Sequence, residues 1–188
     1  IKSSEIPMSQ MLVGDRNAIM IWLRATGYGE MYPVKMVDPS TAEEFETEVD
    51  LSTLKTKELT AQPDENGEFS FDLPRSKKKI KFKLLTVADE SSISKKAESR
   101  NKATKSQISM ALTYRLQSQI TEIDGNRDPS MIAKFVQVMP AYDSLKFREY
   151  SDDIEPGIDL EVDVEGPSGP FRGPFTIGLN FFWPNAGV

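Results

Sequence analysis

Apolar and polar residues alternate through much of the first half of the chain, with the two-residue period of half-buried strands. Residues 30–49 show this alternation on either side of a turn at Pro39 and predict a hairpin. Residues 69–73 and 80–84 repeat it, so a small antiparallel sheet is expected within residues 30–85. In the last of these strands one face is apolar and the other is basic, because lysines fill the alternate positions: Lys79, Lys81 and Lys83.

The period changes at Thr86, which precedes Asp89 with the spacing of a capping box. A block of about four helices is predicted over residues 86–155, where apolar residues recur at three- and four-residue steps. The second helix is expected from about Ser106 to Ile123, along the longest apolar stripe. The third and fourth helices are expected to begin at aspartate caps, Asp128 and Asp143.

The N-terminal region divides into an arm and a helix. Residues 1–13 lack a clear period and are expected to form an extended arm. A helix is predicted over residues 14–27, since Asp15 can cap it and glycines follow it. Its expected apolar face contains Ile19, Trp22 and Leu23.

The C-terminal region returns to strand, with apolar and acidic residues alternating from Ile158. Strands are predicted over residues 158–184, and the last of them is expected from Phe175 to Trp183. The fold class is therefore α+β, with the helical block flanked by antiparallel strand regions. A single domain is expected over residues 14–188.

Composition narrows the possible chemistry. The chain has 188 residues, of which 38% are hydrophobic and 28% charged, and its net charge is -6. It contains no cysteine and no histidine, which excludes disulfides, thiolate or imidazole metal sites, and Ser-His or Cys-His catalytic pairs. Its apolar runs are too short to cross a bilayer, so we expect a soluble protein without membrane insertion.

The order of short motifs along the chain is distinctive, although each motif alone is common. In sequence they are Leu23-Arg24 with Tyr28-Gly29, Val49-Asp50-Leu51, Phe71-Asp72-Leu73-Pro74, Leu84-Leu85-Thr86 with Asp89-Glu90, Thr113-Tyr114-Arg115-Leu116, Ile123-Asp124-Gly125, Phe135-Val136, Asp143-Ser144-Leu145, Pro156-Gly157-Ile158-Asp159 and Phe181-Phe182-Trp183-Pro184. This series covers nearly the whole chain from about Leu12 to Pro184. It resembles the baseplate hub protein family of T4-type contractile-tailed bacteriophages.

The resemblance implies a non-enzymatic structural or assembly protein, a hub subunit that acts through protein–protein interfaces. It implies as partners other baseplate hub or tail proteins in a multi-subunit assembly, with the tape-measure protein as a further candidate. The implied location is the baseplate of the virion tail, and the host cytoplasm during assembly.

The family also implies a zinc-ribbon resemblance, because its two strand regions often carry paired cysteines. The corresponding positions in this chain are Asp38, Thr41, Glu165 and Ser168. Two carboxylates and two hydroxyls are a poor set of zinc ligands. We therefore expect a degenerate, metal-free ribbon, with no cofactor.

Clusters of opposite charge suggest where partners bind. From Arg75 to Lys105 the chain has eleven Lys or Arg against three acidic residues, but Phe82 faces away from the strand lysines, which argues against nucleic-acid binding. A solvated or protein-facing basic surface is preferred, and it could meet the acidic strand of another subunit. Phe182 is a further candidate contact, because alternation places it opposite Phe181. The candidate interface residues are Lys79, Lys81, Lys83, Asp159, Glu161, Asp163 and Phe182.

Two other functions are compatible with the sequence. One is a chaperone of the tape-measure protein or of tail assembly that is absent from the mature virion. The other is a secreted bacterial β-rich binding module, since residues 64–74 resemble part of a carboxypeptidase regulatory-like sandwich. Four helices have no place in such a sandwich.

Overall fold

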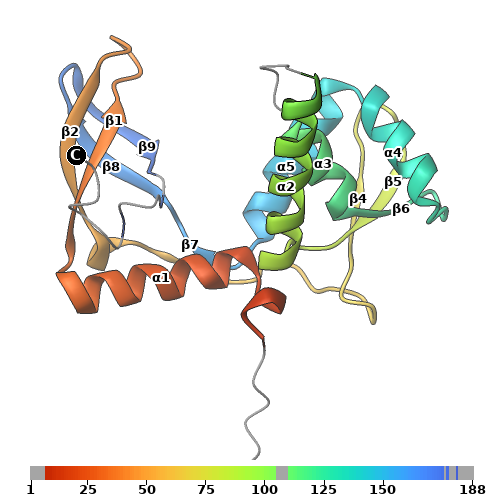
Figure 1. Cartoon of the computed structure of the whole chain (residues 1–188), viewed down its shortest axis with the longest axis horizontal. Helices are drawn as coiled ribbons and strands as arrows, with labels where there is room; N and C mark the ends of the chain where they lie inside the picture. The colour runs from red at the N-terminus through yellow and green to blue at the C-terminus, as the bar shows by residue number, and fades with distance from the viewer. Residues whose placement is uncertain (1–6, 105–109, 176, 178–180, 182–188) are drawn as a thin grey trace, which may run out of the picture. The chain divides into compact units, whose positions relative to one another are not determined.

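The computed structural model describes residues 7–104, 110–175, 177 and 181, and its contacts fall into two compact units (Figure 1). Each unit has its own hydrophobic core. The single domain predicted over residues 14–188 spans parts of both, and its behaviour as one folding unit stays a prediction. Unit 1 comprises Ile1–Val13 and Glu58–Glu155, and unit 2 comprises Gly14–Lys57 and Pro156–Val188.

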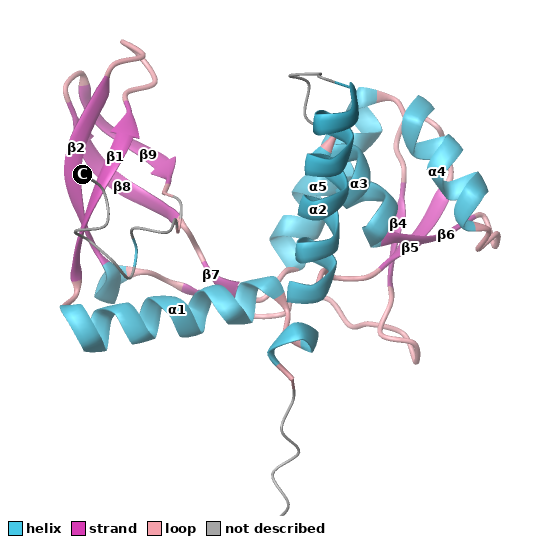
Figure 2. Ribbon diagram, in the orientation of Figure 1, coloured by secondary structure: helices cyan, strands magenta, loops and turns pink. Residues whose placement is uncertain are grey.

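Unit 1 combines a small sheet with a group of helices (Figure 2). Its three strands are antiparallel in the order β4-β5-β6: β4 (Phe69–Asp72), β5 (Lys79–Phe82) and β6 (Ile120–Ile123). Its described helices are η1 (Met8–Gln10), α2 (Val87–Thr104), α3 (Ala111–Gln119), α4 (Pro129–Val138) and α5 (Ala141–Ile154). Phe82 and Phe147 are fully buried where sheet and helices meet, with ring centroids 4.9 Å apart.

Two predicted helix starts are confirmed by their hydrogen bonds. Thr86 and Asp89 form a reciprocal capping box, in which the Asp89 amide donates to Thr86 Oγ1 (3.2 Å) and the Thr86 amide donates to Asp89 Oδ2 (3.0 Å). At α4, the Asp128 carboxylate accepts from the Ser130 amide (2.9 Å), and Pro129 occupies the first helical position. Both starts were predictable because capping is local in sequence.

The second predicted helix is shorter than expected. Its predicted start at Ser106 lies outside the described residues, and α3 ends at Gln119. The prediction that Ile120 and Ile123 continue the helix is wrong: both are buried in β6, where Ile123 pairs with Ile80. β-Branched residues fit a strand well, and the edge of β5 supplies hydrogen-bond partners that a helical pattern does not reveal.

Unit 2 consists of two hairpins, a short strand pair and one long helix. The hairpin predicted over residues 30–49 is confirmed, but it forms its own sheet and does not join β4 and β5. The antiparallel pairs are β1 (Met31–Val37) with β2 (Glu44–Asp50), β8 (Glu161–Gly166) with β9 (Gly169–Pro174), and β3 (Thr56–Lys57) with β7 (Gly157–Ile158). The helices are α1 (Val13–Tyr28) and the short η2 (Leu51–Thr53).

The core of unit 2 lies between the hairpins and α1. Inward residues of β1 and β8 alternate with exposed ones, as the sequence predicted. Tyr32 contacts the rings of Phe175 and Phe181, with centroid distances of 6.4 and 4.8 Å. The last predicted strand differs, because the strand paired with β8 ends at Pro174. Phe182 and Trp183 lie outside the described residues.

Candidate functional site

The ribbon-like region of unit 2 contains a fully buried carboxylate, that of Asp38, in the turn between β1 and β2. Asp38 Oδ1 accepts hydrogen bonds from the backbone amides of Ser40 (2.8 Å) and Thr41 (3.2 Å). Asp38 Oδ2 accepts from the amide of Ser168 (2.9 Å), in the turn between β8 and β9. The Ser168 hydroxyl lies 2.7 and 2.6 Å from the two carboxylate oxygens. We call this contact the Asp38–Ser168 clamp, since it joins the two hairpins at their turns.

The clamp keeps Asp38 ionised. The Ser168 hydroxyl is the largest cause that lowers the pKa of this carboxyl to about 2, and the amides of Ser168, Ser40 and Thr41 add to it. Burial acts in the opposite direction, because it disfavours the charged form. A buried charge is tolerated here since hydrogen-bond donors surround it.

The residues at the expected ligand positions do not fit zinc. Asp38 and Ser168 come together, but the donors of Ser40, Thr41 and Ser168 already occupy the carboxylate oxygens. Thr41 contributes its amide to the carboxylate, and Glu165 is exposed. Zinc in proteins takes thiolate, imidazole or carboxylate ligands in tetrahedral geometry, and a serine hydroxyl is not among them. Across the described residues, no group of three or more acidic side chains could hold a metal ion.

Close packing next to the clamp requires a glycine. A Cβ atom on Gly166 would lie 2.7 Å from Cε1 of Phe171 and 3.0 Å from Asp38 Oδ2. The Phe171 ring in turn packs edge-on against Phe45 of the other hairpin, with centroids 6.0 Å apart. The clamp and this aromatic pair together hold the two hairpins in one arrangement.

The predicted basic face exists on β5, but ion pairs within unit 1 occupy much of it. Lys81 pairs with Asp64 (2.8 Å) and Lys83 with Asp89 (2.9 Å). Lys79 is exposed, and its backbone amide donates to Asp124 (2.9 Å). These contacts reduce the charge that the face can offer to a partner.

Internal ion pairs also involve two of the predicted acidic residues of unit 2. Arg172 of β9 pairs with Asp159 (2.5 Å) and Glu161 (3.1 Å). Asp163 is exposed on β8. The basic and acidic candidates thus lie in different units, and the structure leaves their role in an interface as a prediction.

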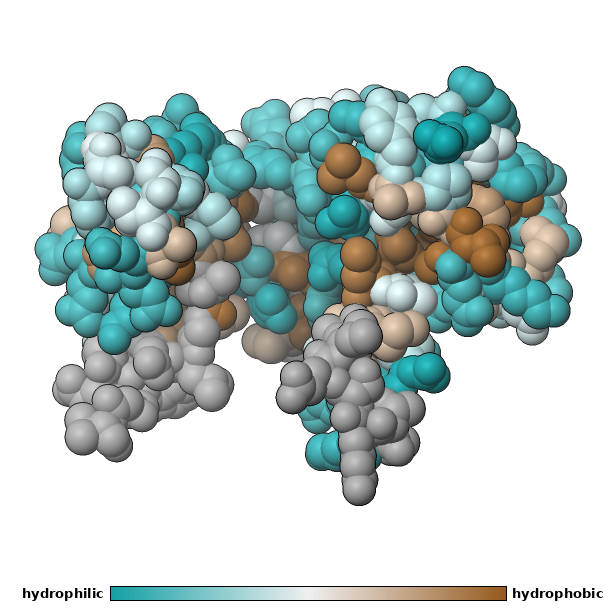
Figure 3. All heavy atoms as spheres, turned by 90° about the horizontal axis from the view of Figure 1, so that it is seen from above, coloured by the Kyte–Doolittle hydropathy of each residue, from teal (hydrophilic) through white to brown (hydrophobic). Residues whose placement is uncertain are grey.

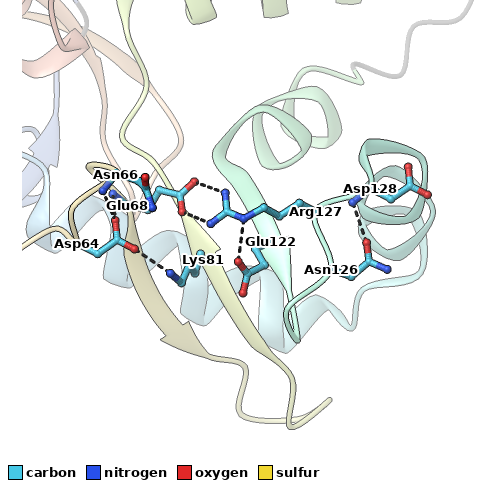
Figure 4. A network of polar contacts seen from close by, with 8 residues as sticks. All are labelled: Asp64, Asn66, Glu68, Lys81, Glu122, Asn126, Arg127 and Asp128. Carbon is cyan, nitrogen blue, oxygen red and sulfur yellow. Dashed lines mark hydrogen bonds and ion pairs between the residues drawn. The ribbon is translucent and has the colours of Figure 1, made fainter.

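Unit 1 contains an ionic network that sequence reasoning missed (Figure 4). The Arg127 guanidinium donates two hydrogen bonds to Glu68 (2.9 and 2.7 Å) and lies 3.0 Å from Glu122. This guanidinium holds the pKa of Glu68 below its ordinary value, although burial opposes the shift. Asp64, in the loop that also contains Glu68, pairs with Lys81 of β5 and extends the network. No local signal predicts these pairs, because Glu68 and Arg127 are 59 residues apart.

The helix α1 of unit 2 has apolar side chains on two faces, and one of them is exposed. Ile19, Trp22 and Leu23 are 44%, 64% and 47% exposed. The expected apolar face is therefore not the one that is buried: Ile21 and Arg24 are buried, and Met20 and Ala25 pack against the core. We call Ile19, Trp22 and Leu23 the α1 stripe. Their spacing places them on one side of the helix, opposite the buried face.

Aromatic contacts explain how a charged residue can occupy the buried face of α1. The Arg24 guanidinium lies over the rings of Tyr28 and Tyr32, 4.9 and 5.6 Å from their centroids. It also donates to the Gly29 carbonyl at the end of the helix (3.4 Å). The contact of Arg24 with Tyr32 of β1 and the burial of Ile21 hold α1 in the rotation that leaves Trp22 exposed.

Unit 1 also exposes apolar side chains on a largely hydrophilic surface (Figure 3). Val138 at the end of α4 is 77% exposed, and Tyr142 near the start of α5 is 51% exposed. Lys146 covers part of Tyr142, with its ammonium 5.9 Å from the ring centroid. These residues belong to a helix junction and do not form a row on one helix. Within the described parts of the chain, no helix is both long and apolar enough to span a membrane.

Comparison with known proteins identifies the family. The model of the T4 bacteriophage base plate protein family matches residues 2–164. Neither the curated proteins nor the solved structures contain a match. Because the family match covers most of the chain, this protein belongs to the T4 bacteriophage base plate protein family and is a structural protein of the phage tail baseplate, where it assembles with other tail and baseplate proteins.

Proposed function

We propose that this protein is a hub subunit of the baseplate of a contractile tail, and that it acts through protein–protein interfaces. The observation that carries the proposal is the α1 stripe: three large apolar side chains face solvent on a helix whose other face is buried. A soluble monomer gains nothing from exposing a tryptophan together with two aliphatic side chains in one row. A baseplate protein that docks on a neighbour buries such a row in its assembled state.

The composition of the stripe suits a protein interface. Tryptophan is the side chain most often found at the energetic centre of interfaces, where surrounding residues exclude water. Ile19, Trp22 and Leu23 occupy positions i, i+3 and i+4, the spacing of the anchors of helices that bind in grooves. Complete burial of a fully exposed side chain of this kind contributes about 1.5–3 kcal/mol. Because these three side chains are already about half buried, the stripe supplies part of the free energy of a micromolar interaction, and contacts around it supply the rest.

The charged strands contribute a second, weaker contact in this proposal. Lys79 and Asp163 remain exposed, whereas internal ion pairs hold Lys81 and Glu161. Exposed ion pairs contribute little to affinity and act mainly on orientation and association rate. Reversal of Lys79, Lys81 and Lys83 to Glu should therefore slow assembly without abolishing it, and unchanged assembly kinetics would remove these lysines from the proposal.

A tape-measure or tail-assembly chaperone is the alternative role. It uses the same kind of surface, because a chaperone also presents exposed apolar residues to its client. It differs in its fate, since a chaperone leaves before the virion is complete. A secreted β-rich module has little support, because unit 1 contains four α-helices within the described residues and the family is a phage family.

Quantitative mass spectrometry of purified tails separates these roles. A hub subunit should be present at a fixed number of copies per tail, in the same proportion to other baseplate proteins in every preparation. A chaperone should be present in lysates of infected cells and absent from purified tails. Absence from tails would overturn the hub proposal.

A further inference from the structure

We propose that the α1 stripe binds a basic amphipathic helix of another baseplate or tail protein, and not a second copy of this chain. This inference rests on the proposed function, because it names the partner of the same surface. It follows from the apolar row itself and from the charge of the unit that carries it.

The net charge of the chain resides entirely in unit 2. Residues 14–57 and 156–188 contain 6 Lys or Arg against 12 Asp or Glu, a net charge of -6. Unit 1 contains 17 of each and is neutral. A partner that approaches α1 therefore enters a negative field, and basic side chains on that partner lower the energy of the complex.

The carboxylates that produce this negative field are exposed on the surface of unit 2. β2 exposes Glu44, Glu46 and Glu48, and β8 exposes Glu161, Asp163 and Glu165. The described ion pairs of these strands are Lys35 with Glu46, and Arg172 with Glu161. The carboxylates of Glu44, Glu48, Asp163 and Glu165 have no such pair within the described residues.

Exposed residues beyond the two ends of the α1 stripe are also negatively charged. Asp15 is exposed one turn before Ile19, and Glu30 is exposed just after the helix ends. Arg16 is partly buried and donates to the neutral amide oxygen of Asn17, so its positive charge remains beside Asp15, whereas Arg24 is buried. An exposed carboxylate thus lies beyond each end of the stripe, and together with the acidic residues of β2 and β8 it complements an apolar row bordered by Lys or Arg.

A second copy is a poor occupant on electrostatic grounds. Two copies docked through α1 would bring two units of net charge -6 together, and like charges within a Debye length of about 8 Å repel. A helix is favoured as the binding element because its side chains form ridges, and a ridge of Ile19, Trp22 and Leu23 packs into the groove of another helix.

Three fluorescent peptides of about 18 residues test the proposal with the full chain. The first is a Leu/Lys amphipathic helix, the second keeps the leucine positions with Glu in place of Lys, and the third is a scrambled Leu/Lys sequence without an apolar face. The Leu/Lys helix should bind at least about 10-fold more tightly than either of the others at about 0.1 M salt. The double variant Trp22→Ser/Leu23→Ser should weaken it by about 10-fold or more, whereas Leu59→Ser should not.

Leu59 is a matched control, because it is 44% exposed, like Ile19, and lies in unit 1. If the Glu peptide binds as tightly as the Leu/Lys helix, the partner need not be basic, and the proposal fails. If the scrambled peptide binds as tightly as the Leu/Lys helix, the partner need not be an amphipathic helix, and the proposal fails. Binding that is unaffected by Trp22→Ser/Leu23→Ser would remove the stripe as its site. A dimer in sedimentation that this variant dissociates would identify a second copy as occupant. Failure of the proposed function is a separate result, namely absence of the protein from purified tails.

Discussion

Ser168 Oγ lies 2.7 and 2.6 Å from the two carboxylate oxygens of Asp38, across 130 residues of chain. The two residues stand at turns where the resemblance to the hub family implied paired metal ligands. A charge-assisted hydrogen bond here does what a structural metal would do, because it connects the turns of two hairpins.

Replacement of either clamp residue should destabilise the protein. Asp38→Asn keeps the size of the side chain but places an amide among four donors, and Ser168→Ala removes one donor. We expect Tm to fall by roughly 5 °C or more for Asp38→Asn, and by less for Ser168→Ala. Asp163→Asn is the matched control, because Asp163 is exposed on β8, the strand that leads to the turn of Ser168. If Asp38→Asn and Asp163→Asn lowered the Tm by the same amount, the clamp would not stabilise the fold.

The clamp should also make the thermal stability of the protein depend on pH. The folded pKa of Asp38 is lowered to about 2, below the roughly 3.9 of an unfolded aspartate. Its contribution is therefore fully present above about pH 4 and is lost as the pH falls toward 2. Other lowered carboxyl pKa values, such as that of Asp64, act in the same direction, so wild type must be compared with Asp38→Asn. The difference in Tm should be constant from pH 7 to about 5 and shrink below about pH 4.

Zinc should have no effect on folding. Of the four expected ligand positions, the structure brings together one carboxylate that is already hydrogen-bonded and one serine hydroxyl. Thermal unfolding in EDTA and in equimolar zinc should give the same Tm. A rise in Tm with zinc that Asp38→Asn abolishes would show that the clamp binds metal after all.

The Arg127 network should depend on the shape of the guanidinium. Arg127→Lys retains the charge but cannot donate two hydrogen bonds to Glu68 while it also contacts Glu122. We expect faster amide hydrogen exchange in the loop around Glu68, and a Tm lowered by a few degrees. Lys134→Arg, an exposed change on α4, is the control. Unchanged exchange in the loop would mean that the network does not hold it.

Local signals predicted much of the fold. The alternation over β1 and β2 and the Thr86–Asp89 capping box are confirmed, because each depends on residues close in sequence. Asp143 shows the limit of such signals. It was expected to cap the fourth helix, but α5 begins at Ala141 and the buried Asp143 carboxylate accepts the amides of Arg75 (2.6 Å) and Ser76 (2.9 Å).

The candidate site was less predictable than the fold. A helix with apolar residues on two sides offers no sequence rule for which side is buried. In α1 the buried side is the one where Ile21 enters the core and Arg24 contacts Tyr32 of β1. The family resemblance singled out Asp38 and Ser168 as positions of interest. It did not reveal that they bind each other, because this hydrogen bond depends on the packing of two hairpins that are distant in sequence.

We propose that the α1 stripe docks this protein in the baseplate. The most direct test of this proposal is quantitative mass spectrometry of tails from infected cells that produce Trp22→Ser/Leu23→Ser as their only copy of this protein, with Leu59→Ser as the control. The stripe variant should be folded, with the Tm of wild type, yet be depleted from purified tails by about 10-fold or more, whereas the control should be incorporated normally. Incorporation of the folded stripe variant at the wild-type level would contradict the account.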